Sequence, residues 1–213
     1  MKKTEEKEMP KGSPELTAAR KEEIVNACEK LYKTMSFKDI TLKEIGNVTS
    51  FTRTSIYNYF RTKEEIFLAL FEREYVRWNK DLQNILNGNE KLGREQLADK
   101  IASSISKREQ LLKLLAMNNY DMESNSRPEL LTSFKVAYGE SIRIMISLLK
   151  KFCPDKSEDD ISDFVYVFFP FMFGIYPYTA VTDKQSKAMD EAHVGFTYHT
   201  VYDITKNCLL RLL

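Results

Sequence analysis

Apolar side chains recur at steps of three and four residues along most of this 213-residue chain, and this spacing constrains the fold more than any other feature. In the segment 63–86 the stripe comprises Ile66, Phe67, Leu70, Phe71, Tyr75, Trp78, Leu82 and Ile85. Such steps place side chains on one face of an α-helix, whereas a half-buried strand requires alternation. The chain contains only 7 glycines and 6 prolines, which favours long helices over many short strands. We therefore predict an all-α fold.

The same patterns divide the chain into expected helices and loops. Helices are predicted over residues 17–35, 52–59, 63–86, 94–106, 107–121, 127–151, 158–179 and 188–212, with a further short helix after Thr41. The pairs Thr41–Glu44 and Thr62–Glu65 have the spacing of capping boxes, in which each side chain binds a free backbone N–H at a helix start. Residues 1–14 are rich in charge and lack an apolar pattern, so we expect a disordered tail.

Composition limits the class of protein. The three cysteines, Cys28, Cys153 and Cys208, are far apart and form no CxxC pair, which is typical of free thiols in a reducing compartment. The first 15 residues contain no apolar leader. The most apolar run, 164–178, is shorter than the roughly 18–20 residues that span a bilayer, and it contains two prolines. We predict a cytoplasmic protein without a membrane partner.

The sequence also lacks the motifs of common enzymes. No GxSxG, P-loop or GxGxxG motif is present. His193 and His199 are six positions apart and no acidic cluster accompanies them, so the spacing does not suit a metal site. We predict that the protein is not an enzyme and has no catalytic residues, bound metal or cofactor.

Positive charge is concentrated in one short segment, although the whole chain carries a net charge of only +1. Residues 36–63 hold five cations and two anions, a local net charge of +3. A positive patch on a near-neutral body is typical of a protein that contacts phosphates with one end. Scattered surface charge is an equally good explanation of this imbalance taken alone.

The same segment has the pattern of a helix-turn-helix. Two helices, each too short to be stable alone, are joined by a tight turn at Thr49–Ser50. Ile45, Phe51 and Ile56 can pack together and fix the angle between these helices. The second helix begins with Thr52-Arg53-Thr54-Ser55. Hydroxyls and a guanidinium at a helix N-terminus suit a DNA groove, because they can bind base edges and phosphates.

Residues 17–70 resemble the DNA-binding domain of the TetR family of bacterial regulators. Three motifs carry the resemblance in the family's order and spacing, namely Thr41-Leu42-Lys43-Glu44-Ile45, Thr52-Arg53-Thr54-Ser55-Ile56-Tyr57-Asn58-Tyr59-Phe60 and Thr62-Lys63-Glu64-Glu65. They correspond to a capped scaffold helix, a recognition helix with an aromatic end, and the start of the fourth helix. Ser50 stands where the family commonly has glycine, and Phe51 where it has a small aliphatic residue. Because serine tolerates a left-handed backbone less well than glycine, we expect the turn to differ.

The resemblance implies which side chains contact DNA. Bases would be contacted by Arg53, Thr54, Ser55 and Asn58, and phosphates by Thr41, Thr52, Tyr57 and Lys63. Tyr59 and Phe60 would be mostly core. Simple packing remains an alternative for Tyr57, and an ordinary surface position for Arg53 and Lys63.

The resemblance also implies the domain organisation: a three-helix helix-turn-helix domain over residues 15–62, then a helical effector-binding and dimerisation domain over 63–213. The run 164–178 is apolar on all sides of its helix, so it must be buried. The predicted last helix has a stripe of Val194, Tyr198, Val201, Thr205, Cys208, Leu209 and Leu212. Two such helices from each chain would form a two-fold four-helix interface, with a purely intrachain core as the alternative.

Aromatic and methionine side chains of the second domain are candidates for an effector pocket, although side chains of this kind more often belong to a plain core. These candidates are Trp78, Met117, Tyr120, Phe134, Tyr138, Phe173 and Tyr176. Few charges interrupt these helices, so the expected ligand is small and mostly apolar or aromatic. We predict a homodimeric repressor that binds a palindromic operator in double-stranded DNA and is released by this ligand. The alternative is a ligand-independent architectural or scaffold factor using the same motif.

Overall fold

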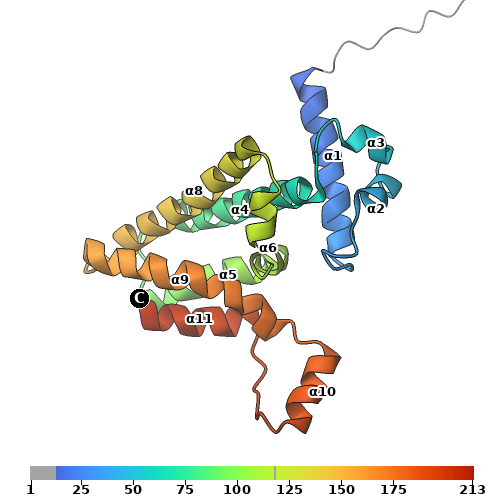
Figure 1. The fold of residues 1–213 in the computed structure, drawn as a ribbon. Coiled ribbons are helices and arrows are strands. Elements are labelled where there is room, and N and C mark those ends of the chain that lie inside the picture. Colours follow the sequence, from blue (N-terminus) through green and yellow to red (C-terminus); the bar gives the residue numbers. More distant parts are fainter. Residues whose placement is uncertain (1–12, 118) are drawn as a thin grey trace, which may run out of the picture. The chain divides into compact units, whose positions relative to one another are not determined.

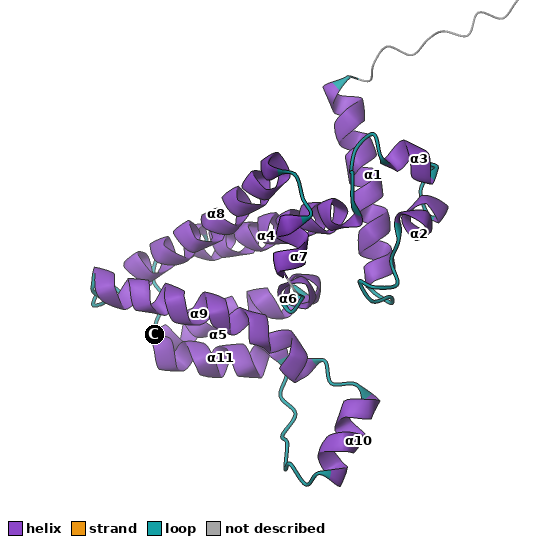
Figure 2. Ribbon diagram, in the orientation of Figure 1, coloured by secondary structure: helices purple, strands orange, loops and turns teal. Residues whose placement is uncertain are grey.

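A computed structural model describes residues 13–117 and 119–213, and in these residues all regular structure is α-helical (Figure 2). The helices are α1 (Pro14–Tyr32), α2 (Leu42–Asn47), α3 (Arg53–Ile56), α4 (Lys63–Asn87), α5 (Arg94–Ser106), α6 (Glu109–Leu115), α7 (Asn119–Ser124), α8 (Pro128–Phe152), α9 (Glu158–Thr179), α10 (Asp183–Glu191) and α11 (Val201–Leu212). The predicted all-α fold is confirmed. Most of the predicted tail lies outside the described residues, but Ser13 caps α1 and Pro14 begins it.

Side-chain caps explain where several of these helices start. The hydroxyls of Thr41 and Thr52 accept from the backbone N–H groups of Glu44 and Ser55, at 3.3 and 3.2 Å. Thr62 caps α4 in the same way, because its hydroxyl accepts from the N–H of Glu65 at 3.2 Å. The contacts of Thr41 and Thr62 are the hydroxyl halves of the two predicted capping boxes, and each of the three contacts satisfies a donor that the helix cannot.

The described residues separate into two compact units. The first contains the chain up to Leu70 together with residues 122–127, and the second contains residues 71–121 and 128–213. The first eight residues of α4 therefore belong to the first unit and the rest of this helix to the second. The sequence pattern did not indicate that the short segment before α8 would pack with the N-terminal helices.

The first unit is held together by packing between short helices. Residues of α1, α2, α3 and the start of α4 supply its core, including Ile24, Cys28, Ile45, Ile56, Phe60, Ile66 and Phe67. The ring of Phe67 meets the rings of Tyr32 and Phe37 edge-on, at centroid distances of 5.1 and 4.7 Å. Because α2 and α3 have only six and four residues, this packing rather than helix propensity must stabilise them.

The second unit is a helical bundle with an aromatic interior. Helix α11 packs on α5 and α9, and α9 also packs on α6 and α8 (Figure 1). The buried aromatic side chains include Phe71, Tyr75, Trp78, Phe134, Phe164, Phe168 and Phe169. No single helix among the described residues has both the length and the apolar composition to cross a membrane; α9 and α10 meet that criterion only together, bent by 84°.

Two long helices that the sequence pattern predicted are each divided in the structure. The predicted helix 107–121 is α6 and α7, and the predicted helix 188–212 is wrong because α10 ends at Glu191 and α11 starts at Val201. Between α10 and α11, His193 and Gly195 have φ values of +53° and +63°, which no helix contains. Val194 and Tyr198, predicted on the last helix, are therefore exposed in the connection.

Candidate DNA-binding surface and ligand cleft

Close approach of α2 to the start of α3 fixes the angle between them. Ile45 and Ile56 are fully buried at this contact. A Cβ atom added to Gly46 would lie 3.4 Å from the backbone nitrogen of Arg53 and 3.5 Å from the carbonyl oxygen of Phe51. Because both neighbours are backbone atoms, they cannot move aside as a flexible side chain could. A methyl group at this position would be in ordinary van der Waals contact with these atoms, whereas a larger side chain would press the two helices apart.

The turn between these helices uses side-chain hydrogen bonds instead of a left-handed residue. Ser50 has no positive φ, and its backbone N–H donates to the carboxylate of Glu23 at 2.7 Å. This contact lowers the pKa of Glu23. The hydroxyl of Thr49 donates to the carbonyl of Gly46 and accepts from the N–H of Phe51. The turn thus differs from a glycine turn, as the sequence predicted.

Phe51, the other departure from the family pattern, is half-buried beside the turn. The guanidinium of Arg20 lies 4.7 Å from the centroid of its ring, and the ring of Tyr59 lies 5.9 Å away. A cation over an aromatic face is attracted to it. The larger side chain is therefore accommodated by contacts with α1 and with the aromatic end of the motif.

The start of α3 presents polar side chains to solvent. Arg53, Thr54, Tyr57 and Asn58 are exposed, as are Thr41 and Thr52, while Ser55 is half-buried. The guanidinium of Arg53 donates to the Tyr57 hydroxyl at 3.3 Å and lies 5.9 Å from the ring centroid. The hydroxyls of Thr52 and Ser55 are 3.0 Å apart. Seven of the eight predicted DNA contacts thus share one region of the chain, around the start of α3 and the start of α2.

Lys63, the eighth, has a structural partner. Its ammonium donates to the carbonyls of Phe37 and Ile40 at 2.8 and 3.3 Å and lies 4.1 Å from the Phe37 ring centroid. An ammonium has three donors, so these contacts leave one for another partner. The contacts join α4 to the segment before α2, and a phosphate contact by Lys63 stays a prediction.

A buried ion pair completes the first unit. The carboxylate of Glu65 is 1% exposed and accepts from Nε and Nη2 of Arg127 at 2.7 and 3.0 Å. The backbone N–H groups of Arg61 and Arg127 donate to the same carboxylate at 2.7 and 3.2 Å. Burial raises the pKa of Glu65, but the hydrogen bonds and charge of Arg127 outweigh burial and the pKa is lowered overall. Local sequence patterns could not indicate this pair, because 62 positions separate its members.

Two more hydrogen bonds hold the segment that carries Arg127. Its Nη2 also donates to the carbonyl of Tyr59 at 3.1 Å. The hydroxyl of Thr62 donates to the carbonyl of Asn125 at 3.1 Å. Residues 122–127, which lead into α8, are thereby tied to the junction between the DNA-binding motif and α4.

The predicted effector residues differ in how deeply they are buried. Trp78 and Phe134 are buried in the aromatic interior, and the indole N–H of Trp78 donates to the hydroxyl of Ser104 at 3.1 Å. Tyr138 is half-buried and meets Tyr75 and Phe169 edge-on. Met117 and Tyr176 are half-buried, whereas Phe173 and Tyr120 are exposed. A ligand contact by these residues stays a prediction.

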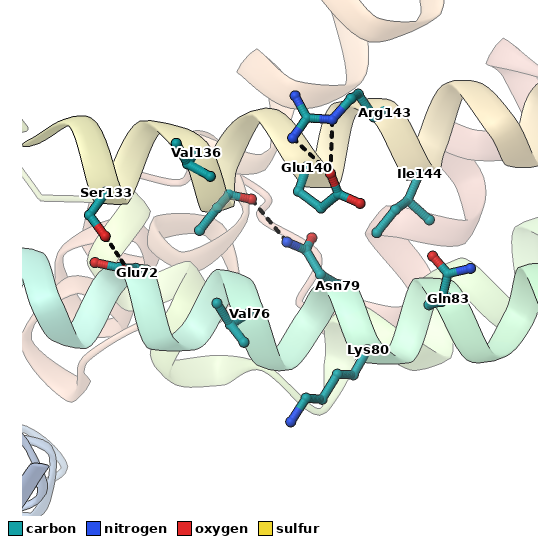
Figure 3. Close-up of a pocket in the computed structure, with 11 residues that line it drawn as sticks. Glu72, Val76, Asn79, Lys80, Gln83, Ser133, Val136, Glu140, Arg143 and Ile144 are labelled. Carbon is teal, nitrogen blue, oxygen red and sulfur yellow. Dashed lines mark hydrogen bonds and ion pairs between the residues drawn. The ribbon is translucent and has the colours of Figure 1, made fainter. Parts of the chain in front are cut away.

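Two clefts do open on the second unit. The first lies between α4 and α8, has a volume of about 430 Å³, and is lined by Glu72, Val76, Asn79, Lys80, Gln83, Ser133, Val136, Ala137, Glu140, Arg143 and Ile144 (Figure 3). The second lies between α8 and α9, has a volume of about 640 Å³, and is lined by Tyr138, Ile142, Ile146, Glu158, Ile161, Ser162, Val165, Tyr166, Phe169 and Pro170. Tyr138 is the only predicted effector residue that lines either of these two clefts.

Hydrogen bonds and an ion pair link side chains across and along the first cleft. The amide nitrogen of Asn79 donates to the carbonyl of Ala137 at 2.9 Å. The hydroxyl of Ser133 donates to the carboxylate of Glu72 at 2.7 Å, and Arg143 pairs with Glu140 at 2.7 Å on α8 (Figure 3). Sequence reasoning missed this site, although the polar residues Glu72, Asn79 and Gln83 recur at helical spacing beside the apolar stripe of α4.

Comparison with known proteins adds a finding independent of the N-terminal motif. Residues 72–200 match the family described as "Tetracyclin repressor-like, C-terminal domain". This matched range begins after the segment that carries the helix-turn-helix resemblance, so the two observations concern different parts of the chain. A comparison with curated proteins finds no match.

Solved structures share the fold over nearly the full length of this chain. The MbdR regulator from Azoarcus sp. CIB is 15% identical, with a TM-score of 0.55 and coverage of 90% of this chain and 97% of its own. FadR from Bacillus subtilis in complex with stearoyl-CoA is 17% identical, with a TM-score of 0.56 and coverage of 90% and 96%. Thermus thermophilus FadR in complex with lauroyl-CoA is 16% identical, with a TM-score of 0.56 and coverage of 91% and 92%. From its family match, its helical fold and its N-terminal motif, this chain belongs to the TetR family of transcriptional regulators.

Proposed function

We propose that this protein is a homodimeric repressor that binds a palindromic operator and is released from it by a small, mostly apolar ligand. The observation that carries the DNA-binding part is the exposed polar surface at the start of α3. Arg53 and Thr54 project from α3 and Asn58 from the turn that follows it, and α3 packs closely on α2 at Gly46. A rigid helix that presents a guanidinium and a hydroxyl, with an amide just beyond its end, can bind base edges in the major groove.

In the proposed complex the two recognition helices of a dimer enter successive major grooves, roughly 34–36 Å apart. Arg53, Thr54, Ser55 and Asn58 would contact bases. Phosphates would be contacted by Thr41, Thr52, Tyr57 and Lys63. The ring of Tyr57 would also hold the Arg53 guanidinium in position before DNA arrives, because the two side chains already contact each other.

Exposed apolar side chains on α9 support the homodimer. Tyr166 is 77% exposed, and Val167, Phe173 and Tyr178 on the same helix are also exposed. A large exposed apolar surface commonly marks an interaction site, and a two-fold dimer buries the same patch of both copies. We propose that α9 and α11 form this interface.

For the ligand, the second unit offers clefts rather than the aromatic interior, which its own side chains fill. The solved FadR structures from Bacillus subtilis and Thermus thermophilus contain stearoyl-CoA and lauroyl-CoA, ligands with long apolar chains. The α8–α9 cleft of this chain has walls of Ile142, Ile146, Ile161 and Val165, which suit an apolar ligand. A ligand must bind the DNA-free conformation more tightly than the DNA-bound one to act as an inducer.

The packed aromatic interior is the observation that favours the alternative, a ligand-independent architectural factor. Trp78 and Phe168 are fully buried there, and Phe134 and Phe169 are nearly so. In that case no small molecule would change the affinity for DNA, and binding would depend little on DNA sequence.

Fluorescence anisotropy on DNA from upstream of the protein's own gene, compared with scrambled DNA over a series of salt concentrations, tests the proposal. We expect tighter binding to the upstream DNA and a loss of affinity with salt, because phosphate contacts release counterions. Arg53→Ala should reduce specific binding about 10-fold or more, since one bidentate base contact discriminates by about 1–3 kcal/mol.

Arg94→Ala is the matched control. Arg94 is an exposed arginine at the start of α5, where it pairs with Asp155. Its removal should leave the affinity for DNA unchanged. Equal, weak binding of the wild-type protein to upstream and scrambled DNA would contradict the proposed repressor of its own gene.

A further inference from the structure

We infer that the α4–α8 cleft is a binding site for a small amphipathic molecule whose N–H or O–H group donates to Oδ1 of Asn79. This cleft is distinct from the α8–α9 cleft proposed above for an apolar ligand, and only the regulatory consequence of the inference rests on the proposed function. Binding itself can be measured without DNA. The starting point of the inference is a buried polar atom that has no partner in the described part of the chain.

Asn79 is 8% exposed, and its two amide atoms have different surroundings. The nitrogen donates to the carbonyl of Ala137 at 2.9 Å, which fixes the orientation of the amide. The oxygen Oδ1 is buried and has no hydrogen-bond partner among the residues that the structure describes. An unpaired buried acceptor is destabilising, so a ligand that donates to it gains more than a contact at an exposed amide would give.

The amide of Asn79 forms part of the wall of this cleft, and its oxygen lies just beneath the surface of that wall. Asn79 lines the cleft and reaches from α4 toward α8 (Figure 3). Through its hydrogen bond to the carbonyl of Ala137, the Asn79 amide lies against α8, and both Ala137 and Glu140 line the cleft.

The walls on either side of Asn79 suit an apolar body. Val76 on α4 is 41% exposed and Val136 on α8 is 61% exposed, and both line the cleft. Ile144, also in the lining, is buried. Burying exposed valine surface under a ligand stabilises the complex by roughly 25 cal/mol per Å² of apolar area. A cleft of about 430 Å³ has room for a phenyl ring or a short alkyl chain.

The charges around the cleft favour a donor and disfavour an anion. The carboxylates of Glu72 and Glu140 are acceptors, and Glu72 receives its hydrogen bond from the hydroxyl of Ser133. Of the two cations, Arg143 is paired with Glu140, and Lys80 points away from α8 (Figure 3). An ammonium or hydroxyl headgroup can therefore donate to Oδ1, whereas a carboxylate placed at Oδ1 would find no donor there.

Three probes with the same phenylbutyl body separate these possibilities: 4-phenylbutylamine, 4-phenylbutan-1-ol and 4-phenylbutyrate. Trp78, the only tryptophan of the chain, is buried with its indole against Ser104, so its fluorescence reports binding only indirectly. Isothermal titration calorimetry on the full-length protein therefore measures the binding of each probe. We expect the amine and the alcohol to bind and the carboxylate to bind at least about 10-fold more weakly. If only the amine binds, the site is one for cations; if both bind, the site recognises the shared donor. Tight binding of the carboxylate would overturn the inference.

Two variants and one control locate the site. Asn79→Leu should weaken binding of the amine about 10-fold, because a hydrogen bond to a buried acceptor is lost. Asn84→Leu makes the same change at an exposed position of the same helix outside the cleft, and it should have no effect. Val136→Phe enlarges an exposed side chain in the wall, so it should block the cleft without disturbing the core. Unchanged binding in Val136→Phe or Asn79→Leu would overturn the inference.

Anisotropy with operator DNA then separates this inference from the proposed function. An amine that binds through Asn79 but leaves the affinity for DNA unchanged would contradict the release mechanism, while the site itself would stand. Failure of the wild-type protein to bind DNA specifically would contradict the repressor, and the calorimetry result would not depend on it.

Discussion

Replacement of Arg127 by alanine should destabilise the first unit through the carboxylate of Glu65. Arg127 supplies three of the four hydrogen bonds that this carboxylate accepts, two of them from its side chain. Removing one partner of a buried ion pair costs about 3–5 kcal/mol, because the other charge stays buried without compensation. Two backbone N–H groups remain in place, so we expect a loss near the lower limit, about 3 kcal/mol.

The effect should depend on pH, with a sign that follows from the pKa of Glu65. In the wild-type protein this pKa is lowered, so the pair contributes stability above the ordinary carboxyl pKa and loses it as the pH falls through the folded value. In Arg127→Ala, burial acts without the arginine and should raise the pKa of Glu65. The variant can then protonate Glu65 at mildly acidic pH, and the difference in stability from the wild type should narrow as the pH falls.

Hydrogen exchange of the buried backbone amides of Ile45 and Phe60 measures this free energy in the first unit alone. Arg94→Ala, which breaks an exposed pair with Asp155, is the control and should cost at most about 1 kcal/mol. The double variant Glu65→Leu/Arg127→Met should recover most of the loss, because it leaves no buried charge. A change of less than about 1 kcal/mol in Arg127→Ala, or a difference independent of pH, would refute this reasoning.

Three further predictions concern the recognition helix, the interior and the dimer. Gly46→Val should abolish DNA binding while the circular dichroism spectrum stays helical, because the branched side chain would collide with backbone atoms near Arg53. Gly46→Ala should be tolerated, because its Cβ would lie 3.4 Å from the backbone nitrogen of Arg53, an ordinary contact distance. Ser104→Ala should lower the free energy of unfolding in urea by about 1–3 kcal/mol, because the buried indole N–H of Trp78 loses its acceptor, and unchanged stability would argue against this bond. If α9 forms the dimer interface, Val167→Asp should shift the sedimentation coefficient to that of a monomer. Val167 is exposed in the single chain, and the aspartate that replaces it would be a charge buried in the dimer.

The sequence predicted those helices best whose two ends carry strong signals. Helices α5 and α9 have the predicted bounds, and α4 ends one residue later than predicted. Their starts are marked by capping residues such as Ser157, and their apolar periodicity is unbroken. The helix-turn-helix was predictable for the same reason, since Thr41 and Thr52 cap its helices at a characteristic spacing.

Periodicity misled the prediction where an apolar spacing continued across a loop. Val194, Tyr198 and Val201 are separated by four and three positions, so they matched one helical stripe. The structure instead starts a new helix after Thr200, whose side chain and that of Asp203 form a capping box. Threonine followed three positions later by aspartate was the signal that could have divided this segment.

Long-range polar contacts left no local signal at all. Glu65 pairs with Arg127 because the segment before α8 packs against the start of α4. The orientation of the Asn79 amide is fixed by the hydrogen bond that its nitrogen donates to the carbonyl of Ala137 on α8. Neither follows from residue type or spacing. The aromatic candidates illustrate the same limit, because Trp78 and Tyr138 differ in burial through packing of α8 and α9 rather than through composition.

The membership of residues 122–127 in the first unit has a consequence for biosynthesis. The ribosome completes the DNA-binding motif well before it adds Arg127, so the carboxylate of Glu65 cannot pair with Arg127 while the first unit begins to fold. The first unit can reach its full stability only after the ribosome has synthesised the chain through Arg127, which includes α4, α5, α6 and α7. The motif should therefore mature late and together with the second unit, although domains generally fold in order from the N-terminus.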